Sequence, residues 1–219
     1  LYLTIGLGGI MAVDLATFLI AISIVVSVRI PQPKKVKIDS TQPSNVLREL
    51  SFGWRYLTKH SSLTILLMWT SLFWLAHDLG QSVYSAMILA RSNSDPRILG
   101  SLTAASGIAG VLSASVMGKF GGFKRQVKGI RLGMLGVGLS KIIFGLGRIP
   151  LIWIPAEFAC CLNLPVLGSS TDTIWIDRVS PEIQGRVFAT TSIVMKSISS
   201  VGYLASGPLA DRFFEPAMM

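Results

Sequence analysis

The sequence predicts an all-α fold, a polytopic membrane bundle of about six transmembrane helices. Its residues are 51% hydrophobic and only 14% charged, with a mean hydropathy of +0.59, whereas soluble domains carry about 25% charged residues. The apolar residues are gathered in blocks long enough to cross a bilayer as helices, which takes about 20 residues. We count six such blocks, at residues 1–28, 61–90, 98–118, 129–147, 149–176 and 186–209.

Two other fold classes are excluded by the same pattern. The connections between the blocks are too short to form the polar shell of a soluble protein. No block alternates with period two, as the strands of a membrane β-barrel would. The first block is expected to be a true span, because a secretory signal begins with basic residues and Leu1–Met11 has none. The chain has no initiator Met, so we expect it to start inside a longer protein.

The basic residues predict the orientation of the bundle. Alternate connections carry fourteen and four Lys or Arg residues, and basic residues in short loops stay in the cytoplasm. We therefore predict a multi-pass protein of the plasma or inner membrane, with loops 29–60, 119–131 and 177–186 cytoplasmic. The net charge of +9 reports this orientation, and no nucleic-acid partner is expected.

The connection at 29–60 has two parts. "RIPQPKKVKIDSTQPS" is proline-rich and basic, so we expect an extended linker. "SNVLRELSFGWRYLTKH" places Leu47, Leu50, Trp54 and Leu57 on one helical stripe. Such an amphipathic helix either lies in the inner headgroup layer or packs on neighbouring loops.

We select six ionisable residues inside the apolar blocks. A charge in hydrocarbon costs about 2.5–3.5 kcal/mol on insertion scales, so such residues usually face a cavity or a partner. They are His77, Asp78, Lys141, Glu157, Asp172 and Lys196.

Depth along the helices separates these residues. Lys196 follows Arg186 by ten residues, which is roughly 15 Å and near the midplane. Asp78 and Glu157 fall in the outer half, where an enclosed acid would bind a proton and release it when water arrives; the alternative for either is a static contact with a neighbouring helix or with Lys196. Asp172 lies nearer the inner end of its block.

The remaining two are weaker candidates. His77 points about 100° away from Asp78 on an ideal helix. Lys141 is expected to extend its long side chain outward to the interface, because Arg148 follows only seven residues later.

The prolines, glycines and cysteines in these blocks are expected mainly to shape and pack the helices. Asn163 lies between Pro155 and Pro165, which suits either a cavity wall or a packing kink. Gly129 and Gly133 form a G-x-x-x-G pair, which permits close helix approach. The adjacent cysteines, Cys160 and Cys161, are expected to be small packing residues.

Four strings resemble one family, the major facilitator superfamily, in its macrolide- and enterobactin-exporter-like branch. "FLIAISIVVSVRIPQP" is similar to the sixth helix running into the central loop. "VMGKFGGFKRQ" is similar to the basic loop motif of the second half, although Gly122 stands where that motif has an acidic residue. "SPEIQGRVFA" (180–189) and "GPLADRFFEP" (207–216) resemble the tenth-to-eleventh loop and the end of the eleventh helix.

The resemblance implies that the chain is a C-terminal half, equivalent to helices 6 to 11 of 12. Residues 1–30 would then be helix six, 31–60 the central cytoplasmic linker with its amphipathic helix, and 61–219 the C-terminal bundle. The loop with Gly118, Gly121, Lys124 and Arg125 would gate the cytoplasmic side. Substrate- or proton-binding candidates are Asp78, Glu157, Lys196, Asp172, Asn163, His77 and Trp74.

The resemblance further implies a secondary active transporter, with proton-coupled efflux of a small amphiphilic molecule by alternating access. The implied partners are that molecule, protons, the lipid bilayer and the missing N-terminal half. A non-transporting membrane scaffold or sensor of the same fold is the alternative. No enzyme, cofactor or metal is expected, because the His77-Asp78 pair has no nucleophile beside it and no H-E-x-x-H or G-x-S-x-G string is present.

Overall fold

A computed structural model describes residues 2–28 and 46–214, and every regular element in this part of the chain is a helix. The predicted extended linker falls within residues 29–45 and lies outside the described residues. The helices are α1 (Tyr2–Ser27), α2 (Val46–Lys59), α3 (Ser61–Arg91), α4 (Pro96–Phe120), α5 (Gln126–Leu146), α6 (Pro150–Arg178), α7 (Pro181–Leu209) and the π-helical turn η1 (Ala210–Phe214). The predicted all-α class is confirmed.

Six of these helices are long and apolar enough to cross a membrane, as predicted. The helices extend beyond the apolar blocks, so two loops are shorter than expected. Only residues 121–125 separate α4 from α5, and only residues 179–180 separate α6 from α7. Most residues of the predicted loops 119–131 and 177–186 therefore belong to the ends of helices.

Helix α1 is a compact unit of its own, within residues 1–42. Its spanning part, Gly6–Ser27, has 22 residues and a mean hydropathy of 2.4. At about 1.5 Å per residue this is roughly 33 Å, enough for the hydrocarbon layer. Gly6 interrupts the helix with a φ of +64°, a conformation that glycine adopts without a steric penalty.

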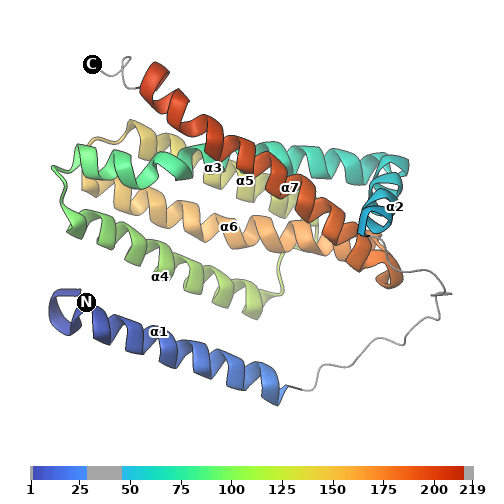
Figure 1. Ribbon diagram of the computed structural model, residues 1–219, viewed down its shortest axis with the longest axis horizontal. Helices are drawn as coiled ribbons and strands as arrows, with labels where there is room; N and C mark the ends of the chain where they lie inside the picture. Colours follow the sequence, from blue (N-terminus) through green and yellow to red (C-terminus); the bar gives the residue numbers. More distant parts are fainter. Residues whose placement is uncertain (1, 29–45, 215–219) are drawn as a thin grey trace. The chain divides into compact units, whose positions relative to one another are not determined.

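The second unit contains α2 to α7, arranged as two groups of packed helices (Figure 1). In one group α6 packs between α4 and α5, and in the other α3 packs on α7, which also carries α2. Two apolar clusters lie near the opposite ends of these helices.

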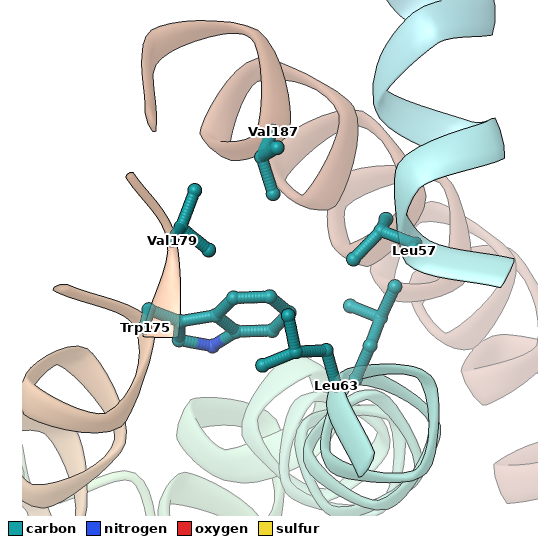
Figure 2. Packing of buried hydrophobic residues seen from close by; sticks show 6 residues of the cluster. Leu57, Leu63, Trp175, Val179 and Val187 are labelled. Carbon is teal, nitrogen blue, oxygen red and sulfur yellow. The ribbon is translucent and has the colours of Figure 1, made fainter. Parts of the chain in front are cut away.

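The first cluster joins α2, α3, α6 and α7 where α3 begins (Figure 2). Leu57, Leu63, Trp175, Val179 and Val187 are all buried there. Because lipid tails are as apolar as these side chains, the cluster stabilises the bundle through close van der Waals packing. It also ties α2 to the bundle.

The second cluster lies at the opposite ends of the helices. It contains Ile88 of α3, Leu102 of α4, Phe144 of α5 and Trp153 of α6. The indole Nε1 of Trp153 donates to the carbonyl of Gly147 at 2.8 Å, so the buried ring leaves no unpaired donor.

Small residues bring α5 and α6 together. A Cβ added at Gly133 would lie 3.0 Å or less from the backbone and Cβ of Leu167, and one added at Gly129 would overlap Ser170. The predicted close approach at the Gly129–Gly133 pair is therefore confirmed.

Helix α2 packs on α7 through one face. Leu57 is buried and a Cβ at Gly53 would overlap Thr190. Trp54 lies on the other side and is 54% exposed. Of the two expectations for this helix, packing on the protein holds for the Gly53–Leu57 face, with helix α7 rather than loops as the support.

Candidate functional site

A pocket of about 580 Å³ lies between the two helix groups, and we call it the central pocket. Its wall is formed by α3, α5, α6 and α7. Its lining is aromatic and hydroxylic, with one carboxylate: Thr70, Phe73, Trp74, Met134, Leu167, Gly168, Thr171, Asp172, Trp175, Ile176, Phe188, Thr191, Ser192 and Met195.

Two of the predicted site residues line this pocket. Trp74 presents its indole from α3, and Asp172 brings the only ionisable group among the lining residues from α6. Along α3 and α6, both residues lie between the members of the two apolar clusters. An aromatic wall with one acid suits an amphiphile that carries a positive charge, since cations are attracted to ring faces as well as to carboxylates.

Asp78 lies deeper in the bundle and is held by α7. Its side chain is 13% exposed, and Ser199 Oγ donates a hydrogen bond to Oδ2. On the other side, His77 Nδ1 lies 3.4 Å from Asp78 Oδ1. The two side chains therefore meet, although they are sequence neighbours that an ideal helix would point apart.

His77 connects this pair to the central pocket through aromatic contacts. Its ring centroid lies 5.2 Å from that of Trp74, edge to face, and 6.5 Å from that of Phe73, stacked. Trp74 and Phe73 both line the pocket. A movement of either ring would therefore change the packing around His77.

Glu157 is buried in an ion pair with Lys141. Lys141 Nζ donates to Glu157 Oε2 at 3.1 Å, and the two side chains are 28% and 7% exposed. The expectation that Lys141 extends outward is wrong. The buried carboxylate of Glu157 on the neighbouring helix, together with the ring faces of Tyr84 at 5.4 Å and Phe144 at 5.7 Å, stabilises an inward ammonium.

The ion pair and the histidine form one polar cluster. Lys141 and Glu157 are both close enough to interact electrostatically with His77, and Cys161 Sγ lies 3.6 Å from Glu157 Oε1. The structure thus brings together four of the six intramembrane residues selected from the sequence: His77, Asp78, Lys141 and Glu157.

Two predicted candidates lie apart from the pocket lining. Lys196 is exposed on α7 and makes no ion pair with any described residue. Asn163 packs against Gly136 of α5 and donates its Nδ2 to the carbonyl of Ala159 at 2.8 Å. Of the two readings of Asn163, helix packing is the one that its contacts support.

The predicted gating loop connects α4 to α5. Gly118 is in the last turns of α4, and Gly121 ends that helix with a φ of +69°, as left-handed glycine caps do. Lys124 and Arg125 follow, both exposed, and α5 begins after Arg125.

Two residues that contact these groups, Ser199 and Tyr84, were not selected from the sequence. Ser199 is one of many serines, and only its position on α7 opposite Asp78 distinguishes it. The ring face of Tyr84 lies 5.4 Å from Lys141 Nζ, a contact that the sequence does not indicate. Asp14 is a carboxylate in the middle of α1, and the rule that selected the other six also applies to it.

Comparison with known proteins finds relatives that are efflux proteins. Over 217 residues the chain is 27% identical to macrolide efflux protein A of Streptococcus pyogenes, which covers 97% of this chain and 52% of that protein. The chain is similar to macrolide efflux proteins. It is also 26% identical to macrolide efflux protein A of Enterococcus faecalis over 207 residues, 92% of this chain and 62% of that protein.

The predicted resemblance to the macrolide-exporter branch is thereby confirmed. The chain spans about half the length of the curated relatives it matches. No protein-family model matches it, and no solved structure matches it at a significant level. Together with the six spanning helices, the similarity indicates a multi-pass membrane protein.

Proposed function

We propose that this chain is part of a membrane transporter that exports an amphiphilic cation in exchange for protons. The observation that carries the proposal is the central pocket, whose aromatic wall contains Asp172 and contacts the His77–Asp78 pair through Trp74. The similarity to macrolide efflux proteins over nearly the whole chain supports the direction of transport.

The central pocket is proposed to form this chain's share of the substrate path. Its volume of about 580 Å³ is within the usual range for small-molecule sites, about 300–1,000 Å³. Phe73, Trp74 and Phe188 offer apolar surface, and Asp172 selects for positive charge. The rest of the path would come from the remainder of a longer protein, which would rock against this bundle so that the site opens to one side at a time.

The polar cluster is proposed to hold the exchanged proton. Asp78 can accept a proton when the bundle closes around it and return the proton when water arrives. His77 can couple substrate binding in the pocket to Asp78, because it contacts both Trp74 and Asp78. Glu157 is already paired with Lys141, so the proton site is assigned to Asp78, whose contacts are Ser199 and His77.

The substrate site is tested with the full-length protein in inverted membrane vesicles, by uptake of a radiolabelled macrolide. We expect Asp172→Asn to weaken the apparent affinity at least about ten-fold, since a hydrogen bond to a charged group contributes about 1.5–3 kcal/mol. Glu182→Gln is the control, because it removes a carboxylate from the exposed first turn of α7. Equal affinity in the wild type and Asp172→Asn would exclude the pocket as the cation site.

Proton exchange is tested in the same vesicles with a pH-sensitive dye. Addition of substrate should move protons in the wild type, and Asp78→Asn should abolish this movement while substrate still binds. A scaffold or sensor of the same fold, the alternative reading, would show no substrate flux and no response to Asp78→Asn.

A further inference from the structure

We infer that a groove at one end of the bundle binds an anionic phospholipid of the inner leaflet. The groove has a volume of about 830 Å³ and lies between α3, α5 and α6. It is separate from the central pocket and its function does not depend on transport. Four cations surround it, Arg125, Lys128, Arg131 and Arg178, and we call it the inner basic groove.

The positive charges around the groove outnumber the negative ones. Asp177 is the one carboxylate among its lining residues, against four basic side chains. Within residues 46–214, none of these four cations makes an ion pair or a side-chain hydrogen bond with the protein. The groove therefore carries an excess of about three positive charges, and an anion of similar multiplicity or a lipid phosphate complements it.

The wall below the charges is apolar. Ile65 and Trp69 of α3, Ile130 of α5 and Ile174 of α6 line it. From Ser62 to Trp69 the groove follows α3, and these two residues are roughly 10 Å apart along the helix axis. A free phosphate would fill only the charged rim, whereas a phospholipid would use both the rim and the apolar wall.

The position of the groove in the fold explains why it stays open. α3 belongs to one helix group and α5 and α6 to the other, and neither α5 nor α6 packs extensively on α3. The groove lies where α3 and α5 begin and α6 ends. The basic residues at these ends are those that indicate the cytoplasmic side, so the groove opens at the depth of inner-leaflet headgroups.

Trp69 gives the groove a link to the central pocket. Its indole Nε1 lies 3.0 Å from Met134 Sδ, and Met134 lines the central pocket while Trp69 lines the groove. This contact forms part of the partition between the two spaces. A lipid seated on Trp69 would brace α3 against α5 at that point.

The test measures how much phosphatidylglycerol remains bound to the purified full-length protein after detergent exchange, by mass spectrometry of the intact complex. We expect phosphatidylglycerol to be retained and phosphatidylcholine to be lost. In the variant with Lys128→Gln, Arg131→Gln and Arg178→Gln, affinity should fall roughly 100-fold, because each basic residue contributes about five-fold.

Two further variants separate the groove from a diffuse surface potential. The control with Arg55→Gln, Lys59→Gln and Lys119→Gln removes the same charge from exposed positions at the same end of the bundle. It should reduce affinity less than the groove variant does, because none of these three residues lines the groove. Ile65→Trp fills the apolar wall and keeps every charge, so it should also weaken retention.

Three results would overturn the inference. Equal losses in the two triple variants would show a diffuse potential. Unchanged retention in Ile65→Trp would show that no acyl chain enters the groove. Displacement of phosphatidylglycerol by millimolar inorganic phosphate alone would identify a free-phosphate site.

Discussion

Lys141 and Glu157 form an ion pair between α5 and α6, with 3.1 Å between Nζ and Oε2, at a level of the bundle where both helices are expected to lie in hydrocarbon. The pair accounts for two charges that would otherwise be costly in the membrane. Because each charge is the other's partner, the contribution of the pair to the free energy of unfolding can be measured by removing one residue and then both.

The first prediction concerns this pair. Lys141→Met should lower the free energy of unfolding by about 3 kcal/mol, because removing one partner leaves a buried charge unpaired. The double variant Lys141→Met with Glu157→Gln should recover most of the loss. Thermal unfolding in detergent measures both, and Lys119→Met, an exposed site at the end of α4, is the matched control. If the single and double variants were equally destabilised, the pair would not be coupled.

The second prediction concerns the contact between α5 and α6. Gly133→Ala should destabilise the bundle by about 1–3 kcal/mol, because the new Cβ meets the backbone of Leu167 and the helices must separate. Gly138→Ala lies on the same helix with no atom near its Cβ, and should be neutral or stabilising by up to about 1 kcal/mol. The two substitutions are chemically identical, so a difference in sign isolates the packing. The same sign at both positions would contradict the close approach.

The third prediction concerns the docking of α2. Gly53→Leu should detach α2 from α7, because its Cβ would overlap Thr190 and approach the carbonyl of Arg186. Limited proteolysis between α2 and α3 should then become faster. Ser51→Leu, on the exposed side of the same helix, should leave cleavage unchanged. A protease-resistant Gly53→Leu protein would mean that α2 does not need this contact.

The fourth prediction concerns the link from pocket to proton site. Trp74→Leu removes the edge-to-face contact with His77 and keeps an apolar side chain in the pocket wall. We expect the number of protons moved per substrate to fall by more than substrate affinity does, since the proposed coupling runs through that contact. Trp54→Leu is the control, because Trp54 is 54% exposed on α2 and does not line the central pocket. Equal effects of the two substitutions on the proton ratio would remove Trp74 from the coupling.

Local pattern was enough to predict the spans and the residues that needed an explanation. Block length and low charge predicted six helices, and the structure contains them. The Gly129–Gly133 spacing predicted close packing, and the contacts with Ser170 and Leu167 bear this out. These predictions succeeded because transfer into lipid depends mainly on composition over about 20 residues and because a glycine pair at this spacing acts on one helix face.

The partner of each intramembrane charge could not be predicted from the sequence, because it depends on which helices become neighbours. Nothing near Lys141 in the sequence indicates that Glu157, on the next helix, would hold it inward, or that Ser199, on α7, would reach Asp78. Asp172 and Lys196 read alike as buried charges, yet one lines the central pocket and the other lies exposed on α7. The sequence by itself determined that charges must be placed in a membrane bundle, because their desolvation cost is a property of each residue. Only the tertiary structure decided which charge meets a partner and which faces a pocket, because electrostatic and packing energies act over a few ångströms between segments far apart in the chain.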